Sequence, residues 1–284
     1  MNKPILSTAL LSLALGAGCG EYPGGAYVQP HVSFVAADSS AASDAPAEGS
    51  EAAADAGTPG AFTGKVVLKG DRAALPPLIT QGSDVKDKEV CAAVDIPDER
   101  LVLGEANGVA NVFIYLAKAP KNGKQLEVPA APFFFDQKNC KFLPHCLIVP
   151  TGQTIKVLSD DSVAHNTHTY PNRNTSISSV VSAGDRVGQV EFKYTKAETA
   201  PFAVTCDFHG WMKAYHLPLD HPYYAVTDEN GEFSIPDLPA GKHTFVVWHE
   251  AADGNYIERK LAVEIQSGGT TELQIDYPVE KLKL

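Results

Sequence analysis

Apolar and polar residues alternate along most of the chain beyond residue 60, which is the pattern of β-strands with one buried face. Proline, glycine and asparagine separate the alternating runs and predict turns between them. The region 71–100 is irregular and predicts loops with one helical turn. No long amphipathic helix is evident, so we expect an all-β protein. The strands are predicted in 62–68, 110–116, 133–135, 142–149, 154–159, 191–194, 201–205 and 243–248.

Two groups of strands can be distinguished. Those predicted between 133 and 205 are numerous enough for a Greek-key sandwich. Later in the chain, Asn230 and Gly231 lie within the run 225–235, and this dipeptide favours the tight turn of a β-hairpin. The pattern therefore predicts a Greek-key sandwich with further strands before and after it, and no internal repeat.

The first residues have the pattern of an export signal, which we place at 1–19. Lys3 supplies a positive charge, and the apolar run 5–15 is too short to span a bilayer. The residues up to Cys19 resemble a bacterial lipobox, from which Gly16 departs because leucine is usual there. We expect a bacterial extracytoplasmic protein, in the periplasm or at the outer membrane, anchored by lipid on Cys19. Simple secretion is the alternative.

Residues 20–60 are predicted to form a disordered tether. The part from 36 to 60 consists almost entirely of Ala, Ser, Asp, Glu, Gly, Pro and Thr and contains no aromatic residue. Such a segment cannot bury enough apolar surface to offset its ordering entropy. His31 lies here and is expected to be solvated rather than a ligand.

The chain has 284 residues and a formal net charge of -11, part of which lies in the tether. After the leader and tether are removed, enough apolar sequence remains for one large or two small domains. The acidity argues against nucleic acid as a partner. It is compatible with a redox carrier that associates with basic patches on other proteins.

The segment 204–216 carries the chemistry. Cys206, His209 and Met212 have the spacing Cys-x2-His-x2-Met and follow an apolar stretch. One thiolate, two imidazoles and a weak axial thioether are the ligands of a blue-copper electron-transfer site. The segment supplies three of these four ligands. An upstream neighbouring strand should supply the other imidazole, and the run His165-Asn166-Thr167-His168 offers two candidates, His165 and His168.

The His-Asn pair upstream and the Cys-x2-His-x2-Met loop downstream resemble those of cupredoxins, most closely the amicyanin-like members. The resemblance covers 128–221 and implies a Greek-key sandwich with one type 1 copper ion. It also implies that His165 is the fourth copper ligand, that Asn166 hydrogen-bonds across to the Cys206 loop and that His168 does not bind copper. Trp211 is expected to exclude water from the site.

The remaining strands resemble those of a carboxypeptidase-regulatory-like, or transthyretin-like, β-sandwich. Residues 227–247 show the order T-D-x-x-G-x-F-x-I, then L-P-x-G and a later valine. In that family this motif follows two strands that match 64–68 and 110–116. We therefore predict a split sandwich formed by 61–127 plus 222–284, into which the cupredoxin domain, 128–221, is inserted. Two sheets in tandem, with 60–127 packed on the cupredoxin, are the alternative.

The chain contains five cysteines. With Cys19 assigned to lipid and Cys206 to copper, an odd number remains, so at most two can pair. Similar envelope proteins carry Cys91 and Cys140, which makes that disulfide our preference. A bond between Cys140 and Cys146 is the rival, and three reduced thiols are the third alternative.

These observations predict a carrier of single electrons between extracytoplasmic redox proteins, such as a c-type cytochrome. In cupredoxins the histidine that corresponds to His209 has a partly exposed edge, and electrons leave through it. The resemblance implies that Trp211 lines the surface patch on which the redox partner docks. A copper-handling lipoprotein and a structural protein with a relic copper site are the alternatives. We do not expect the protein to be an enzyme. A binuclear copper site needs a second cysteine in the loop and multicopper oxidases need His-x-His pairs, and the sequence contains neither.

The other histidines are expected to be packed or hydrogen-bonded rather than metal ligands. A second metal site would require two of them to gather around Glu250. These histidines are His145, His216, His221 and His249.

Overall fold

The computed structural model describes residues 57–284. The predicted export signal, the predicted lipidation site Cys19 and residues 20–56 of the predicted tether lie outside the described residues. Within 57–284 nearly all of the regular secondary structure is strand, so the predicted all-β class is confirmed. No helix in this part is long and apolar enough to cross a membrane.

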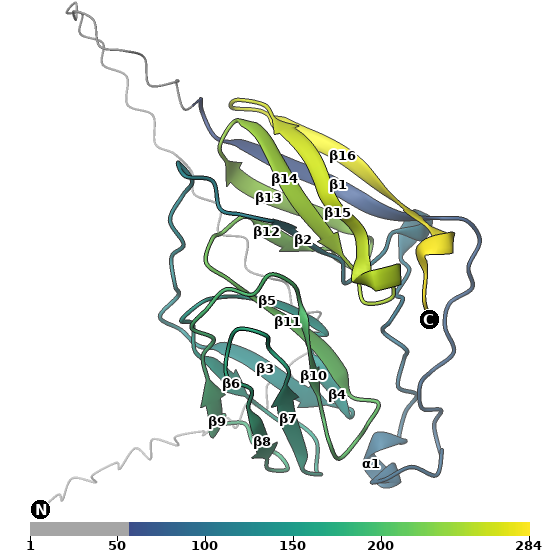
Figure 1. Ribbon diagram of the computed structural model, residues 1–284. Helices are drawn as coiled ribbons and strands as arrows, with labels where there is room; N and C mark the ends of the chain where they lie inside the picture. Colours follow the sequence, from purple (N-terminus) through teal and green to yellow (C-terminus); the bar gives the residue numbers. More distant parts are fainter. Residues whose placement is uncertain (1–56) are drawn as a thin grey trace, which may run out of the picture. The chain divides into compact units, whose positions relative to one another are not determined.

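Two sheets enclose the first hydrophobic core (Figure 1). One has the order β13-β1-β16 and the other the order β12-β2-β14-β15. Alternate side chains of these strands point into the space between the sheets, which is the periodicity expected of a sandwich. The strands are β1 (Gly60–Lys69), β2 (Phe113–Leu116), β12 (Tyr224–Val226), β13 (Glu232–Leu238), β14 (Gly241–Trp248), β15 (Tyr256–Ile265) and β16 (Thr270–Pro278).

Strands from early and late parts of the described chain share this first sandwich. β1 runs antiparallel to β13 and parallel to β16, while β2 lies between β12 and β14. Phe62 of β1 packs against Phe245 of β14 with ring centroids 4.8 Å apart. Strands that precede residues 128–221 thus pair with strands that follow them, which is the arrangement that the insertion hypothesis predicts.

Two further sheets, with the orders β5-β11-β10-β7-β8 and β4-β3-β6-β9, enclose the second core. The ends of β7 and β10 in this sandwich carry the residues of the candidate site. The strands are β3 (Phe133–Lys138), β4 (Lys141–Leu143), β5 (Cys146–Pro150), β6 (Ile155–Val157), β7 (His165–Thr169), β8 (Ser178–Val181), β9 (Val190–Phe192), β10 (Phe202–Thr205) and β11 (Lys213–Leu219).

The two sandwiches meet through a third apolar cluster. β2 and β14 contribute Phe113 and Trp248, and β5 and β11 contribute Ile148 and Tyr215. Tyr215 packs against Trp248 with ring centroids 4.9 Å apart. β2 and β5 are buried along their whole length, and β14 is buried over its last four residues, so both faces of these strands are covered at the contact.

Two predicted strand arrangements are wrong. The run 142–149 is not one strand, because Pro144 separates β4, which pairs with β3, from β5, which pairs with β11. Proline has no N–H group to donate to a ladder and so favours the break. The run 225–235 is not a β-hairpin, although Gly231 N–H donates to Asp228 O in a turn at 3.0 Å. Its two strands diverge into different sheets, β12 beside β2 and β13 beside β1.

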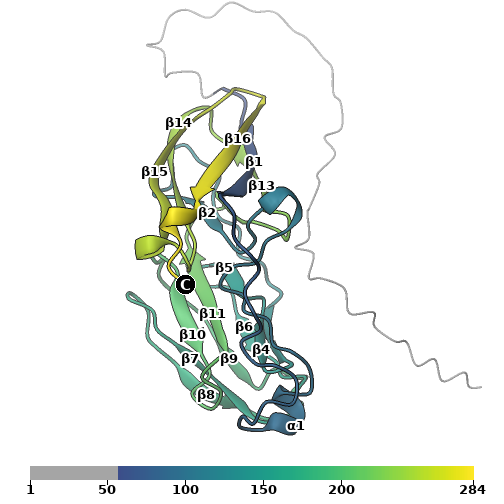
Figure 2. The same cartoon turned by 90° about the vertical axis from the view of Figure 1, so that its right-hand side faces the viewer.

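The irregular region 71–100 contains the short helix α1 (Lys88–Cys91). We expect all of 61–127 to belong to the first sandwich, but Cys91 and Ile96 lie in the core of the second. Figure 2 shows α1 beside the second sandwich, far from β1. The predicted boundary is therefore wrong for this segment. Three short 3-10 helices complete the described chain, η1 (Glu105–Asn107), η2 (Asp253–Asn255) and η3 (Val279–Lys281).

Candidate metal centre

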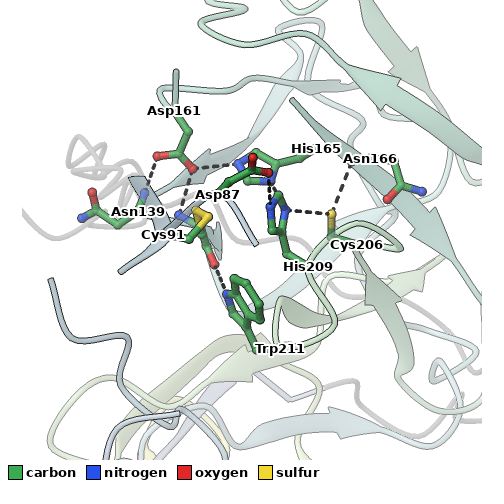
Figure 3. The surroundings of a disulfide bond; sticks show 10 residues. Asp87, Cys91, Asn139, Asp161, His165, Asn166, Cys206, His209 and Trp211 are labelled. Atoms are coloured by element: carbon green, nitrogen blue, oxygen red, sulfur yellow. Dashed lines mark hydrogen bonds and ion pairs between the residues drawn. A yellow bond between two sulfur atoms is a disulfide. The ribbon is translucent and has the colours of Figure 1, made fainter. Parts of the chain in front are cut away.

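Three of the four predicted copper ligands come together at one end of the second sandwich (Figure 3). His165 Nδ1 lies 3.0 Å from His209 Nδ1, and Cys206 Sγ lies 3.7 Å from the same His209 nitrogen. One ligand atom from each residue lies within 4.8 Å of the others. His165 and His209 are 0% exposed and Cys206 is 2% exposed, so the group is buried.

Strand pairing explains why these residues meet. β10 runs antiparallel to β7 with Thr205 opposite His168, which places Cys206 beside the beginning of β7. A tight loop then returns the chain towards β11. In it, Met212 N–H donates to His209 O at 2.9 Å and Cys206 N–H donates to Met212 O at 3.3 Å. Backbone hydrogen bonds within the loop 206–212 therefore hold Cys206, His209 and Met212 close together.

Asn166 joins the two ligand segments. Its Oδ1 accepts a hydrogen bond from the Asp207 N–H at 2.6 Å, and its Nδ2 donates to Asp207 Oδ2 at 2.7 Å. Its backbone N–H points at Cys206 Sγ at 3.5 Å. Asn166 therefore supports the site without being a ligand, which is the role that the cupredoxin resemblance implies.

Each imidazole is held from behind by a carboxylate. His165 Nε2 lies 2.9 Å from Asp161 Oδ2, and His209 Nε2 lies 2.9 Å from Asp87 Oδ2. An ionised carboxylate can only accept, so each Nε2 carries the hydrogen. In the neutral rings both Nδ1 atoms then present lone pairs to each other across 3.0 Å. Two lone pairs at that distance require a proton or a metal ion between them.

The environment of Cys206 favours its thiolate form. Burial opposes ionisation, but the contacts with the His165 and His209 imidazoles and the hydrogen bonds from the backbone N–H groups of Asn166 and Phe208 outweigh it, and the pKa falls from 9.0 to about 6. The thiolate is the form of cysteine that binds metals. Cys206 is therefore prepared as a ligand near neutral pH.

His165 shows the complementary shift. Burial disfavours its charged form, but hydrogen bonds and charges from Asp161 and Cys206 outweigh that effect and raise the pKa from 6.5 to about 9. In the metal-free site His165 therefore holds a proton beside the thiolate of Cys206. A metal cation can replace that proton.

The separations fit one shared ion. Zinc, a comparable transition-metal ion, binds imidazole nitrogen at about 2.0 Å and thiolate sulfur at about 2.3 Å. Two nitrogens on one ion can then lie up to about 4 Å apart, and a nitrogen and a sulfur slightly further. The observed 3.0 Å and 3.7 Å are within these limits. Two imidazoles and one thiolate, with a weak thioether, suit copper.

Met212 and Trp211 lie next to this group in the loop that carries Cys206 and His209. Met212 is 1% exposed and belongs to the same apolar cluster as Cys206. Its role as axial ligand stays a prediction. Trp211 is half-buried, its ring centroid lies 5.2 Å from that of His209, and its Nε1–H donates to Cys140 O at 3.2 Å. The indole therefore covers one side of the imidazole.

The expected exposure of His209 is wrong. In place of a partly exposed edge, the ring is fully buried and its outer nitrogen contacts Asp87, which comes from the irregular region before α1. The neighbouring Lys86 covers the Phe208 ring, with its Nζ 4.7 Å from the centroid. The region 71–100 thus covers the side of the site through which cupredoxins are expected to pass electrons.

Asp87 and Asp161 were not singled out from the sequence as site residues. Asp161 lies four residues before His165, and a carboxylate near a ligand is a weak signal that could have been followed. Asp87 lies 122 residues before His209 in a segment without periodicity. No local pattern there indicates its contact.

The remaining histidines are not gathered into a second site. Among residues 57–284, the groups with three ligand atoms at metal distance are the one described above and Cys140, Asp161 and His165. Neither surrounds Glu250. His168 lies 3.1 Å from Asp207 and stacks on Tyr170. Two further histidines have pKa values lowered by burial, His216 to about 3 and His249 to about 4.

The structure contains the disulfide Cys91–Cys140. Cys146 is a free buried thiol at the contact between the two sandwiches, and it donates to Asn111 O at 3.4 Å. Burial raises the pKa of Cys146 well above 9.0, so it stays protonated.

Comparisons with known proteins find matches to parts of the chain. A family model described as polysaccharide lyase family 4, domain II, matches residues 196–273, which span portions of both sandwiches. The comparison with curated protein sequences gives no match.

Among solved structures, similar chains include cupredoxins and a copper-containing nitrite reductase. A copper-containing nitrite reductase from Thermus scotoductus has 17% identity and a TM-score of 0.28 over 34% of this chain and 25% of its own. An amicyanin from Paracoccus versutus has 13% identity and a TM-score of 0.26 over 37% and 97%. A purple cupredoxin from Nitrosopumilus maritimus has 22% identity and a TM-score of 0.24 over 31% and 99%. The chain thus spans a quarter of the nitrite reductase.

Proposed function

We propose that this protein binds one copper ion in a type 1 site and carries single electrons between redox proteins. The observation that supports it best is the convergence of two imidazole nitrogens and one thiolate sulfur in a buried group. The outer nitrogens of both rings are fixed by carboxylates, so the inner nitrogens are left as metal ligands.

Each residue has a distinct part in this proposal. His165 and His209 supply Nδ1, Cys206 supplies its thiolate, and Met212 lies in the same apolar cluster for the weak axial position. Copper bound there would supply one-electron chemistry between its two oxidation states. The hydrogen bonds of Asn166 and the two carboxylates hold the ligands in one geometry, which keeps structural change on electron transfer small.

The sequence supplies the remaining parts of the proposal. We assign the chain no catalysed reaction, because the loop 206–212 has one cysteine where a binuclear copper site needs two. We further propose that the protein is exported, that lipid is attached at Cys19 and that the redox partner is a protein such as a c-type cytochrome. These assignments place the carrier on the extracytoplasmic side of a bacterial membrane.

The direct test is a titration of the purified metal-free protein with Cu(II), followed by absorption and EPR spectroscopy. One equivalent should produce an intense visible thiolate-to-copper band and an EPR signal of a single copper species. Zn(II) should occupy the same ligands and prevent the band. Weak absorption with copper bound only through nitrogen and oxygen would reject the type 1 assignment.

A second candidate function is copper handling without electron relay. The full burial of His209 beneath Asp87 favours it, because an electron carrier is expected to present this ring at its surface. The electron self-exchange rate distinguishes the two functions. Rapid, reversible exchange supports the carrier, whereas slow or irreversible cycling supports handling.

Replacing Met212 with leucine is expected to keep copper bound and to raise the reduction potential. The thioether is a weak donor to copper, and its loss leaves the reduced state relatively more favoured. Leucine has a similar volume, so the packing around Met212, which is 1% exposed, should change little. Protein-film voltammetry measures the shift. A potential equal to that of the wild type would show that Met212 is not the axial ligand.

A further inference from the structure

The segment 79–96, which we call the cap, forms a closed loop over the candidate metal centre. Its ends are joined by an antiparallel bridge in which Ile96 N–H donates to Ile79 O at 2.8 Å. Inside the loop, Gln81 N–H donates to Asp95 Oδ1 at 2.6 Å, and Gln81 Nε2 donates to Ala93 O at 2.9 Å. The cap is therefore held together by its own hydrogen bonds.

Asp87 is the residue of the cap that reaches the site. Its backbone has φ 54°, a left-handed conformation that few residues other than glycine adopt. Its carboxylate Oδ2 lies 2.9 Å from His209 Nε2. Because the neighbouring Lys86 also lies over Phe208, two successive cap residues contact the loop 206–212.

The disulfide attaches the cap next to this contact. Cys91 lies one helical turn after Asp87, and its N–H donates to Asp87 O at 2.9 Å. Its partner Cys140 lies in the turn between β3 and β4. The covalent bond therefore fixes the cap to the second sandwich within one turn of the residue that contacts His209.

The same disulfide adjoins the support of the other imidazole. Cys140 N–H donates to Asp161 Oδ2 at 2.8 Å, and this oxygen also contacts His165 Nε2. Cys140 O accepts the Trp211 indole hydrogen at 3.2 Å. Figure 3 shows both carboxylates, the disulfide and the imidazoles in one connected group.

We propose that Asp87 is a positioning residue of the metal centre and that the disulfide-anchored cap controls metal exchange at His209. The proposal deepens the proposed copper function and rests on it. Asp87 holds His209 in the tautomer whose Nδ1 faces the metal position, and the cap closes the edge by which solvent and competing ligands would reach the ring. The bond Cys91–Cys140 keeps the carboxylate in place.

Two variants and one matched control test this proposal. Asp87→Asn removes the carboxylate and leaves the disulfide intact, and the Asp87 side chain is 34% exposed, so folding should persist. The double variant Cys91→Ala/Cys140→Ala releases the cap. Asp84→Asn makes the same chemical change on the cap at a side chain that is 93% exposed and contacts Lys88 rather than the site.

The first readout needs no metal. Diethyl pyrocarbonate modifies accessible imidazoles, and mass spectrometry reports the modification of His209 in the metal-free protein. His209 should be protected in the wild type and in Asp84→Asn and modified in the double variant. Equal protection in all of them would overturn the role of the cap, whether or not the protein binds copper.

The second readout is the release of copper to a Cu(I)-specific chelator. Outer-shell partners of metal-bound histidines typically contribute about 10-fold to 100-fold to metal affinity. We expect release to be faster by about that factor in Asp87→Asn and in the double variant, with Asp84→Asn unchanged. The copper EPR parameters should also shift in Asp87→Asn, which a purely structural role would not cause.

These outcomes separate the two proposals. If the wild type gives the thiolate-to-copper band but all variants release copper at its rate, the copper function stands and the positioning role is wrong. If the wild type binds no copper, the proposed function fails, while the modification of His209 still decides whether the cap covers the ring.

Discussion

Cys206→Ala is expected to abolish the intense visible absorption of the copper-loaded protein. The band requires a thiolate bonded to Cu(II), and Cys206 is the one free cysteine of the described chain whose pKa is lowered, to about 6. Alanine leaves at most the two imidazole nitrogens and the thioether, a set without a charge-transfer partner of this kind. Absorption and EPR spectra of the Cu(II)-loaded variant measure the effect.

Cys146→Ala is the matched control for this prediction. Cys146 is also a free and buried thiol, but it lies in the apolar cluster between the sandwiches and keeps its proton. The control should retain the full band, and thermal unfolding should show that both variants stay folded. Persistence of the band in Cys206→Ala, or its loss in Cys146→Ala, would show that Cys206 is not the sulfur that binds copper.

The class of the fold could be predicted because strand periodicity is a local property. β1, β3 and β10 lie where alternation predicts them. The assignment of strands to sheets is not local. The strands β12 and β13 flank a turn with a hairpin sequence, yet each pairs with a neighbour in a different sheet. The turn sequence is compatible both with a hairpin and with two separate strands, and tertiary packing determines which of the two forms.

In the candidate site, too, the local features could be predicted and the non-local contacts could not. Cys206, His209 and Met212 lie on one loop, so their spacing alone indicated a metal site. His165 was found from a second short motif that β7 carries beside β10. The contact of Asp87 with His209 depends on a disulfide and on the path of an irregular segment, neither of which produces a periodic signal. The burial of the site could therefore not be predicted from the sequence.

A buried ion pair joins the two sandwiches at their contact, and its loss should have a large effect on stability. His145 Nε2 and Glu250 Oε1 form a short hydrogen bond, with 6% and 5% of their side chains exposed. His145 precedes β5 of the second sandwich, and Glu250 follows β14 of the first. Glu99 lies on the other side of the ring, with Oε2 3.7 Å from His145 Nδ1.

Both pKa values of this pair favour its charged form. Burial opposes the charge on His145, but the hydrogen bond and charge of Glu250, with the charge of Glu99, outweigh it and raise the pKa above 6.5. Burial likewise opposes the charge on Glu250, but His145 outweighs it and lowers the pKa below 4.5. The pair is therefore ionised in the folded protein throughout the interval between these two values.

Glu250→Gln is expected to lower the free energy of unfolding by about 3 kcal/mol at pH 5.5, because removing one partner leaves a buried group without its countercharge. Urea unfolding measures the difference. Glu99→Gln is the control and should have a smaller effect, since the Glu99 side chain is 20% exposed and lies further from the ring. Equal stability of Glu250→Gln and the wild type would show that the contact does not depend on this pair.

The pH dependence of that difference gives the more specific test. The contribution of His145, whose folded pKa is raised, is complete below 6.5 and is lost as the pH rises through the folded value. The contribution of Glu250, whose folded pKa is lowered, is complete above 4.5 and is lost as the pH falls through the folded value. The advantage of the wild type over Glu250→Gln should therefore be largest between pH 4.5 and 6.5 and decline on both sides. A difference that is constant from pH 5 to 9 would mean that packing or the hydrogen bond alone, and not charge, holds the sandwiches together at this point.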